Sequence, residues 1–391
     1  QGKTVYIAGS SAEWEPGGLF YGRLEEAEAV FNVNIEFIPD DTELYMTRLL
    51  AGDSTLDIWT TDNRRFWQMI GRGAFLPVDD YVPEDYFENI PNPARNIAKY
   101  NFSFQGQTYG FGVQPRLTDF AFLIYNKSLL ERENQPDPWE LYLEDAWTWD
   151  ALGEIAKAVT RDTDGDGEID QFGITHAGWH QTIGFWVPSN GAVTVKIVDG
   201  KYVFGLTDEE AIWALQKMSD WRHVDRVFGS STDDMFNGKA AFYAHNQTQF
   251  GKIQEMIGDV DEIRIVPMAK GPHADEYVYP IRGAHSWLLP SNSQAPAALI
   301  QLTDFLCPPQ EYERNMMQWI SQVARDRNSM QLLRVAHETY GGQALDFERV
   351  LEDEVKDAVR YVERAEKSAT TAMAEVAPKA QLLLNETLGQ F

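Results

Sequence analysis

A short acidic segment, residues 162–170 (DTDGDGEID), has the residue spacing that most directly suggests chemistry. Asp162, Asp164 and Asp166 alternate along the chain before a glycine, so their carboxylates can converge on one cation, as at the start of an EF-hand loop. Gly173 stands where the closing glutamate of such a loop would be. The alternative is a solvated acidic turn. The pattern predicts a structural calcium site whose candidate ligands are Asp162, Asp164, Asp166, Glu168 and Asp170, the last in place of that glutamate.

Aromatic residues are abundant, with 12 Trp, 16 Tyr and 21 Phe. Sugars present C–H faces that pack on flat rings, while their hydroxyls need polar partners. Five tryptophans lie on or near predicted helices and are expected to pack in the core: Trp139, Trp147, Trp149, Trp213 and Trp221. For six of the others the choice between core packing and ligand stacking is open. These six fall in or beside predicted loops or strand ends and are candidates for stacking on a sugar: Trp14, Trp59, Trp179, Trp186, Trp287 and Trp319.

The sequence lacks the common signatures of covalent and nucleotide chemistry: a GxSxG elbow, a P-loop and a complete GxGxxG. His176 and His180 are four residues apart, but the intervening glycine disfavours a zinc-binding helix. The only cysteine, Cys307, excludes an intrachain disulfide and is predicted to be a small buried hydrophobe. Paired carboxylates for glycoside hydrolysis stay open, since their separation is a three-dimensional property.

Length and charge restrict the class of protein. At 391 residues the chain exceeds one ordinary core, so two domains are expected, and 43% hydrophobic and 24% charged residues are typical of globular proteins. Sixty acidic residues against 33 basic ones give a formal net charge of −27, which excludes nucleic acid as an expected partner. The chain opens QGKTVYIAG; we expect that a leader was removed and that Gln1 and Gly2 are remnants.

Hydrophobic periodicity predicts an α/β protein. Strands are expected at residues 4–8, 34–38 and 56–59, alternating with helices at 19–31 and 43–50, which suggests a largely parallel sheet. Ligands bind beyond the carboxyl ends of such strands, here near residues 9–14 and 60–63. Further expected elements are extended segments at 109–113 and 121–125, strands at 240–244 and 263–266, and helices at 149–159 (capped by Thr148), from Thr207 (in a capping box with Glu210), at 295–306 and at 346–365.

Several segments together resemble one family. They are LAGDSTLDIWTTDN and GAFLPVDDYV (residues 50–63 and 73–82), FQGQTYGFGV and FLIYNKSLLE (within 104–131), TWDALGEIAKAVT (148–160), FNGKAAFYAHN (236–246) and VYPIRGAHSWLLPSNSQAPAALIQLTDFL (278–306). In this order they resemble the family 1 extracellular solute-binding proteins of ABC importers, the maltose-binding-protein-like group. Each segment alone is weak, and the ordered set covers most of the chain; residues beyond about 326 are the least diagnostic.

The resemblance implies a two-lobe periplasmic-binding-protein-like fold (type II) with a ligand cleft between the lobes. Lobe one is expected to comprise residues 1–113 and 284–325, and lobe two residues 114–283 and 326–391. Pro115, Pro280 and Gly283 flank the expected crossings, where a few residues can absorb the rotation of hinge closure. The implied location is extracytoplasmic, periplasmic or at the cell surface, with any lipid anchor absent from this chain.

The resemblance also implies ligand-binding residues. Trp59, Asp62 and Asn63 match the first-lobe binding loop, and Trp179 and His180 match a second-lobe contact. The segment that re-enters the first lobe contributes three more, Arg282, His285 and Trp287. The full set of predicted ligand-binding residues is Trp14, Trp59, Asp62, Asn63, Asp119, Trp179, His180, Trp186, Asn246, Arg282, His285, Trp287 and Trp319.

We therefore expect a monomeric, non-enzymatic component of an ABC importer that binds a sugar or oligosaccharide reversibly and delivers it to permease subunits. No organic cofactor is expected. Two alternatives stay open: a secreted carbohydrate-active enzyme of the glycosidase type, and a binding protein for a non-sugar solute such as a polyamine or peptide.

Overall fold

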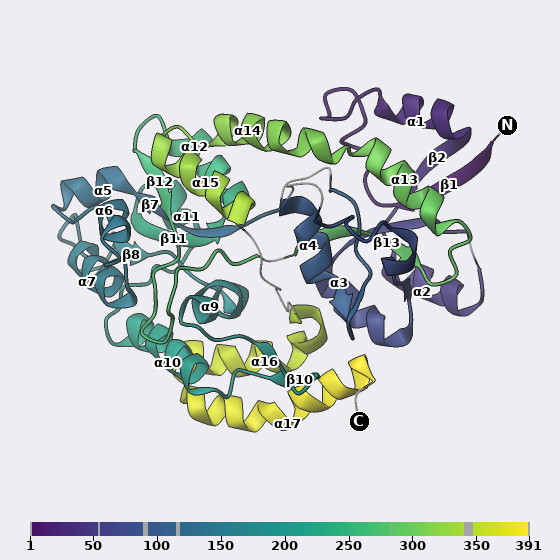
Figure 1. The fold of residues 1–391 in the computed structure, drawn as a ribbon. Helices are drawn as coiled ribbons and strands as arrows, with labels where there is room; N and C mark the ends of the chain where they lie inside the picture. The colour runs from purple at the N-terminus through teal and green to yellow at the C-terminus, as the bar shows by residue number, and fades with distance from the viewer. Residues whose placement is uncertain are drawn as a thin grey trace.

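Two separate central sheets, one in each half of the molecule, organise the fold, and helices pack around both (Figure 1). The structure, a computed structural model, describes residues 2–53, 55–88, 93–114, 118–281, 283–339 and 347–389. The predicted α/β class is confirmed. Within the described residues, none of the helices has the length and apolar composition that a membrane span requires.

The first sheet has the strand order β2-β1-β3-β13-β4. Its strands are β1 (Lys3–Ala8), β2 (Val33–Ile38), β3 (Ile58–Asp62), β4 (Phe75–Leu76) and β13 (His285–Pro290). β1 runs parallel to β2 and β3, whereas β13 runs antiparallel to β3 and β4. A strand from far along the chain therefore lies inside a sheet otherwise built from the first 76 residues.

The helices and short elements around this sheet come from the same two parts of the chain as its strands. They are α1 (Arg23–Phe31), α2 (Thr42–Leu50), α3 (Asn63–Met69), η1 (Ile70–Arg72), η2 (Asp79–Tyr81), α4 (Pro93–Asn101), the hairpin of β5 (Ser103–Phe104) and β6 (Gln107–Thr108), and α13 (Pro296–Leu306). α13 packs against α1, and α4 packs against β13. The late segment thus completes the packing of the first half as well as its sheet.

The second sheet has the order β12-β7-β11-β8, with β7 (Ala121–Asn126), β8 (Phe172–Ile174), β11 (Ala240–Asn246) and β12 (Ile263–Val266). β7 is antiparallel to both neighbours, and all six of its residues are buried, which fits its continuous apolar sequence. Around it lie α5 (Lys127–Arg132), α6 (Pro138–Leu143), α7 (Trp149–Val159), α8 (Trp179–Gln181), the π-helix η3 (Thr182–Trp186), α9 (Val187–Ser189), the hairpin of β9 (Val195–Val198) and β10 (Lys201–Phe204), α10 (Glu209–His223), α11 (Asp233–Phe236) and α12 (Gln247–Ile257).

The C-terminal helices bridge the two halves (Figure 1). After η4 (Pro309–Glu311) come α14 (Tyr312–Val323), α15 (Arg327–Thr339), α16 (Glu348–Glu363) and α17 (Ala369–Leu388). α14 packs against α12 and α15, and α15 packs against β12 and contacts α4. α16 and α17 pair with each other and with α10, and both also contact α3 of the first half.

Two of the segments in which the chain crosses between the halves lie side by side. Ala121 donates its N–H to the Pro280 carbonyl at 2.8 Å, next to a bridge between Phe120 and Ile281. Gly283 has φ +74°, and a Cβ there would lie 3.1 Å from the Arg64 guanidinium, so a larger residue would be strained. Of the other predicted hinge positions, Pro115 lies outside the described residues. The sheets lie on either side of these crossings, while the predicted lobe boundaries themselves stay a prediction.

Most expected elements form, with three instructive differences. The predicted first helix begins only at Arg23, because the preceding residues form turns that include Gly17 and Gly22 at positive φ. The third strand runs from Ile58 to Asp62 rather than over 56–59, so residues predicted in a loop lie in a strand. The predicted capping box at Thr207 is wrong: Asp208 is the N-cap of α10, without a side-chain hydrogen bond.

Candidate functional site

A cleft of about 620 Å³ lies between the two halves, within the size range of small-molecule sites. The first half contributes Glu13, Leu19 and Arg64; the crossing segments and the start of β13 contribute Gln114, Thr118, Asp119, Gly283 and His285. The second half and α14 contribute Asn246, Gln247, Thr248, Asn315, Gln318, Trp319 and Gln322. The lining is mostly polar and rich in neutral amides, which both donate and accept hydrogen bonds.

The floor of the cleft is a junction between β11 and α12 that holds the outgoing crossing segment. Asn246 Nδ2 donates to Asp119 Oδ2 at 2.6 Å, and Thr248 donates to the same carboxylate through Oγ1 (2.9 Å) and its backbone N–H (3.1 Å). Gln247 donates from its backbone N–H to the Phe120 carbonyl (2.9 Å) and from Nε2 to the Thr118 carbonyl (2.7 Å). Burial raises the pKa of Asp119, although these hydrogen bonds oppose the change.

One face of α14 forms another wall. Asn315, Gln318, Trp319 and Gln322 follow the three- and four-residue spacing that places side chains on one side of a helix. Trp319 is half-buried, so part of its ring faces the cleft, and it is the one tryptophan among the lining residues. Such a wall offers a flat apolar surface flanked by neutral hydrogen-bonding groups.

A charged network connects the cleft to α8 and α16. Arg64 binds Asp62 (Nη2 to Oδ2, 3.0 Å) and lies 3.9 Å from Glu348 Oε1, which His180 Nδ1 also approaches at 3.9 Å. Arg349 lies 4.0 Å from Asp62. Burial would raise the pKa of the Asp62 carboxyl, but the Arg64 guanidinium and hydrogen bonds from Arg64 and the next residue bring it below its usual value. Asp62 therefore stays ionised and bound to protein partners.

Contrary to the prediction, five of the six predicted ligand tryptophans are core residues in the structure; one of them, Trp179, is described below with His180. Trp14, Trp59, Trp186 and Trp287 are each 3% exposed or less. The indole N–H of Trp59 donates to Asp40 at 2.8 Å, and those of Trp14 and Trp287 donate to backbone carbonyls. The ring of Trp186 packs against two further buried tryptophans. Their burial leaves almost no ring surface for a ligand.

The other predictions divide into two groups. Asp119, Asn246, His285 and Trp319 do line one cleft. The remaining residues are not among those that line it: buried Asp62 caps α3, buried Asn63 donates its N–H to the Ala284 carbonyl at 2.8 Å, and buried Trp179 packs against His180. Arg282 lies outside the described residues.

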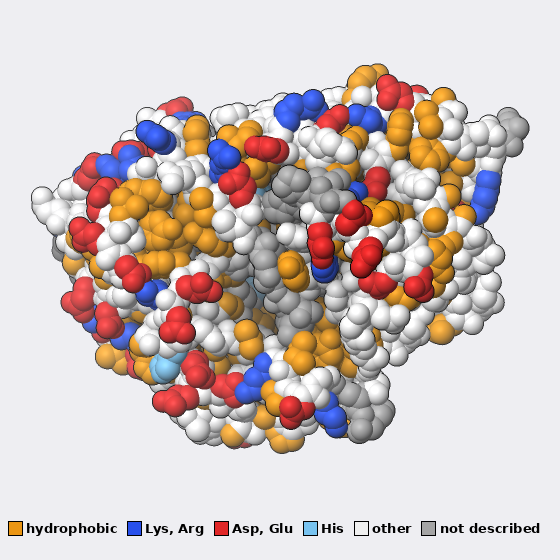
Figure 2. Space-filling view, viewed as in Figure 1, with side chains coloured by type: hydrophobic (Ala, Val, Ile, Leu, Met, Phe, Trp, Pro, Cys, Tyr) orange, Lys and Arg blue, Asp and Glu red, His pale blue; other side chains and the backbone are white. Residues whose placement is uncertain are grey.

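Sequence reasoning missed most of the amide lining. Gln247, Thr248, Gln318 and Gln322 carried no motif of their own, although the amide-rich face of α14 could have been found from its three- and four-residue spacing. Other minor predictions hold: Cys307 is buried, and burial raises the pKa of its thiol. Figure 2 shows acidic side chains over both halves of the viewed face, in keeping with the net charge.

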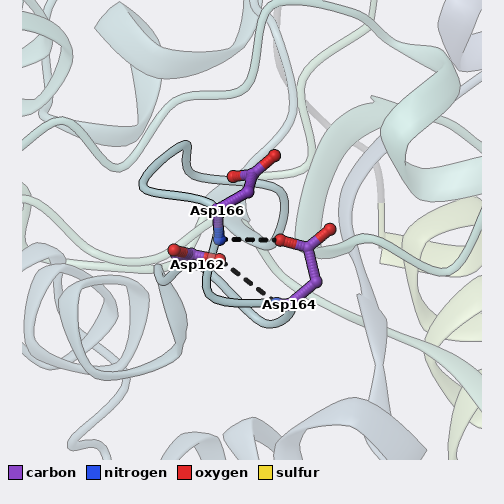
Figure 3. Close-up of side chains that lie close together, drawn as sticks. All are labelled: Asp162, Asp164 and Asp166. Carbon is purple, nitrogen blue, oxygen red and sulfur yellow. Dashed lines mark hydrogen bonds between the residues drawn. The ribbon is translucent and has the colours of Figure 1, made fainter.

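The acidic loop gathers three carboxylates at the surface (Figure 3). Ligand oxygens of Asp162, Asp164 and Asp166 lie within 4.8 Å of one another. Asp162 accepts three backbone N–H groups, from Asp164 (3.1 Å), Gly165 (2.6 Å) and Gly167 (2.7 Å), and these hydrogen bonds lower its pKa.

The two other predicted ligands stand outside this group. The Asp170 carboxylate accepts hydrogen bonds from the backbone N–H and hydroxyl of Thr163, which lower its pKa, and Glu168 donates its backbone N–H to Asp166. Because converging carboxylate oxygens suit a hard divalent cation, Asp162, Asp164 and Asp166 fit the predicted metal chemistry.

Comparison with known proteins gives a family and a fold. The family described as bacterial extracellular solute-binding protein matches residues 23–324. A cyclo/maltodextrin-binding protein complexed with maltotetraose has 18% identity and a TM-score of 0.71, over 99% of this chain and 98% of that one. The maltose/maltodextrin-binding domain MalE from Bdellovibrio bacteriovorus, bound to maltotriose, has 17% identity and a TM-score of 0.64, over 99% and 100%. UgpB from Mycobacterium tuberculosis, in complex with glycerophosphocholine, has 13% identity and a TM-score of 0.66, over 99% of each chain.

Proposed function

Since this chain belongs to the bacterial extracellular solute-binding proteins, we propose that it is the extracytoplasmic binding component of an ABC importer and that its solute is a sugar or oligosaccharide. Structures of the same fold hold maltotetraose and maltotriose. Another holds glycerophosphocholine, so the fold alone does not select the solute. The selection must come from the side chains that line the cleft.

The observation that carries the sugar proposal is the wall of α14. Trp319 offers a ring face, and Gln318 and Gln322 flank it with groups that can both donate to and accept from hydroxyls. The volume of about 620 Å³ accommodates a small oligosaccharide rather than a single ion. These features support a neutral, polyhydroxylated ligand.

Isothermal titration calorimetry with a solute panel tests the proposal. The panel contains maltotriose, maltotetraose, tagatose, glycerophosphocholine and a polyamine. We expect one-to-one binding of a sugar, with the sugar recovered unchanged by chromatography. Cleavage products would establish the enzyme alternative, and binding of only glycerophosphocholine or the polyamine would establish a non-sugar solute.

A matched pair of variants locates the binding site. Trp319 and Trp213 are both half-buried, but only Trp319 lines the cleft. Trp319→Ala should weaken sugar binding at least about fivefold, since stacking on a ring contributes on the order of 1 kcal/mol. Trp213→Ala should leave the affinity unchanged. Equal affinities of both variants would place the ligand elsewhere.

Delivery to the permease requires a closed, liganded form that differs from the open one. The cleft takes residues from both halves, so a ligand that contacts both favours the closed arrangement. The paired crossing segments near Pro280 and Gly283 are where we place the hinge. Small-angle scattering should show a smaller radius of gyration with saturating sugar; an unchanged radius would argue against closure. A lipid anchor and the monomeric state belong to the same proposal.

We further propose that calcium binds at Asp162, Asp164 and Asp166 and stabilises the folded protein, since a ligand that binds only the folded state raises its stability. In a metal-stripped sample, calcium should raise the melting temperature, and a chelator should reverse the change. Asp164→Asn should reduce this response. Asp353→Asn, which removes one carboxylate from exposed α16 surface, is the control and should not. No calcium response in the unaltered protein would dismiss the site.

A further inference from the structure

His337 of α15 is a fully buried ionisable residue directly below the floor of the cleft. Its side chain has no exposed surface, and the ring of Phe120 meets it edge-on at 4.8 Å between centroids. Nδ1 lies 3.1 Å from the Tyr312 hydroxyl oxygen, and Nε2 lies 3.2 Å from Gln247 Oε1. Both ring nitrogens therefore have polar partners inside the protein, and one of those partners lines the cleft.

The hydrogen bonds fix the protonation of this ring. The Thr118 carbonyl can only accept, so Gln247 must present Nε2 to it, at 2.7 Å. Gln247 then directs Oε1 at His337, and an amide oxygen also only accepts, so His337 must carry its proton on Nε2. The bare Nδ1 accepts from the Tyr312 hydroxyl. Burial lowers the pKa of His337 to about 3, in agreement with a neutral ring.

This arrangement acts on the cleft through Gln247. The side-chain amide of a glutamine can rotate so that its oxygen and nitrogen swap positions, unless hydrogen-bond partners select one orientation. The Nε2–H of His337 and the Thr118 carbonyl together select one orientation of the Gln247 amide, while the backbone N–H of Gln247 holds the Phe120 carbonyl. Between these two anchors lies Asp119, whose carboxylate faces the cleft.

We propose that His337 is a positioning residue for solute binding: its Nε2–H orients Gln247 and thereby sets Thr118 and Asp119 at the floor of the cleft. The proposal deepens the proposed function and rests on it for the ligand. If His337 were only a core residue, any loss of ring packing would weaken solute binding. The proposal instead expects that loss of the Nε2–H lowers the affinity more than loss of the rest of the ring.

Two substitutions separate the two sides of the ring. In His337→Gln, the terminal amide can reach the position of Nε2 and donate to Gln247. In His337→Asn, the shorter side chain keeps an acceptor near the position of Nδ1 for Tyr312 but does not reach Gln247. Tyr312→Phe is the control: it removes the other hydrogen bond to the ring and leaves the one to Gln247 in place.

The first readout needs no ligand. Hydrogen exchange, followed by mass spectrometry, reports on the backbone N–H of Gln247 and Ala121, which hold the crossing segments. His337→Asn should exchange these amides at least about tenfold faster than the unaltered protein, whereas His337→Gln and Tyr312→Phe should stay within about twofold. Equal acceleration in all three variants would overturn the proposal, because loss of general stability would then explain it.

The second readout is the Kd of maltotetraose, measured by calorimetry. His337→Asn should raise the Kd about fivefold to tenfold, and His337→Gln should restore it to within about twofold of the unaltered protein. Loss of binding in His337→Gln as large as in His337→Asn would overturn the proposal. If the unaltered protein does not bind maltotetraose, the choice of ligand fails, and the exchange experiment alone decides the role of His337.

Discussion

Two strand-to-helix junctions, one in each half, have the same local structure but different surroundings. β3 passes directly into α3 at Asp62 and Asn63, and β11 passes directly into α12 at Asn246 and Gln247. In each, the last strand residue caps the helix with its side chain, accepting from a backbone N–H at 3.0 Å and 3.2 Å respectively. In each, the first helical residue is buried and donates its N–H to a crossing segment.

The difference lies in what surrounds the caps. Asp62 is bound by Arg64 with Arg349 nearby, a charged arrangement that ties α3 to α16. Asn246 binds Asp119 with Thr248 alongside, and this group faces open cleft. The same strand-to-helix connection therefore serves stability where its polar groups have charged protein partners, and it lines the cleft of the proposed function where they do not.

The largest expected difference in stability is between alanine variants of Trp59, in the strand of the first junction, and Trp319, which lines the cleft. Trp59 is 1% exposed within the first sheet, so Trp59→Ala should lower the free energy of unfolding by about 3–5 kcal/mol through loss of buried surface and a cavity. Trp319→Ala, at a half-buried position, should cost far less and instead weaken sugar binding. Urea unfolding followed by circular dichroism measures both; a cost for Trp319→Ala equal to that for Trp59→Ala would remove the contrast.

Removal of the two caps should give the next largest difference. Asp62→Ala loses a cap and leaves two guanidinium groups without their carboxylate, and we expect a cost of about 2–3 kcal/mol. Asn246→Ala loses a cap and one hydrogen bond to Asp119, for about 1–2 kcal/mol, but it should weaken sugar binding more. A larger stability loss for Asn246→Ala would show that the second junction is the structural one.

Acid should act on the second junction before the first. The folded pKa of His337, about 3, is below its unfolded value of 6.5, so the unfolded state binds the extra proton as the pH falls. Stability should fall from about pH 6.5 downwards, by up to about 1.4 kcal/mol per pH unit. Asp62, whose folded pKa is lowered, contributes stability that is lost only on further acidification, below its unfolded pKa near 4.

The measurement is the difference in unfolding free energy between the unaltered protein and His337→Gln at each pH. This difference isolates His337 from Asp119 and Asp304, whose pKa values are raised by burial and which favour the folded state as acid is added. Tyr312 is the titratable partner of the ring, and burial raises its pKa, so it keeps its proton throughout. Parallel pH curves for the two proteins would contradict the prediction.

The smallest effect is expected at the edge of the second junction. Thr248→Val removes one hydroxyl hydrogen bond to Asp119 at nearly constant volume, and it should cost no more than about 1 kcal/mol of stability. It should change sugar affinity by a few-fold, because it alters the Asp119 carboxylate in the cleft. Thr47→Val on α2, an exposed position away from the cleft, is the control and should leave affinity unchanged.

Periodicity predicted the elements better than the site. Apolar spacing predicts the strand at Ile263–Val266 and, together with the cap at Thr148, the helix at Trp149–Val159, since burial imposes that spacing locally. The site depends on which polar groups find protein partners, and those partners lie far away in the sequence: Asp40 for Trp59, for example, or Leu306 for Trp14. No local sequence pattern predicts such a partner.

The residues that sequence reasoning did find share one property. Asp119, Asn246, His285 and Trp319 line the cleft, the first three next to a crossing segment and Trp319 on a face of α14. β3 ends three residues later than predicted, at Asp62 rather than at residue 59, so Trp59 lies inside the strand and is buried instead of standing at its end. Site prediction therefore fails first where an element boundary is uncertain, because neighbouring residues of a strand point to opposite faces.

The position of β13 sets an order on the folding of the newly made chain. The second sheet needs only residues 121–266, whereas the first waits for β13, which pairs with β3 and β4 from residues 285–290. Synthesis begins at the N-terminus, so the sheet whose first strands emerge first is the sheet that is completed last. β1 to β4 must stay unfinished while some 200 further residues are added, and contacts of such long sequence separation form slowly. Until β13 is made, one edge of β3 has no partner strand and is open to wrong pairing.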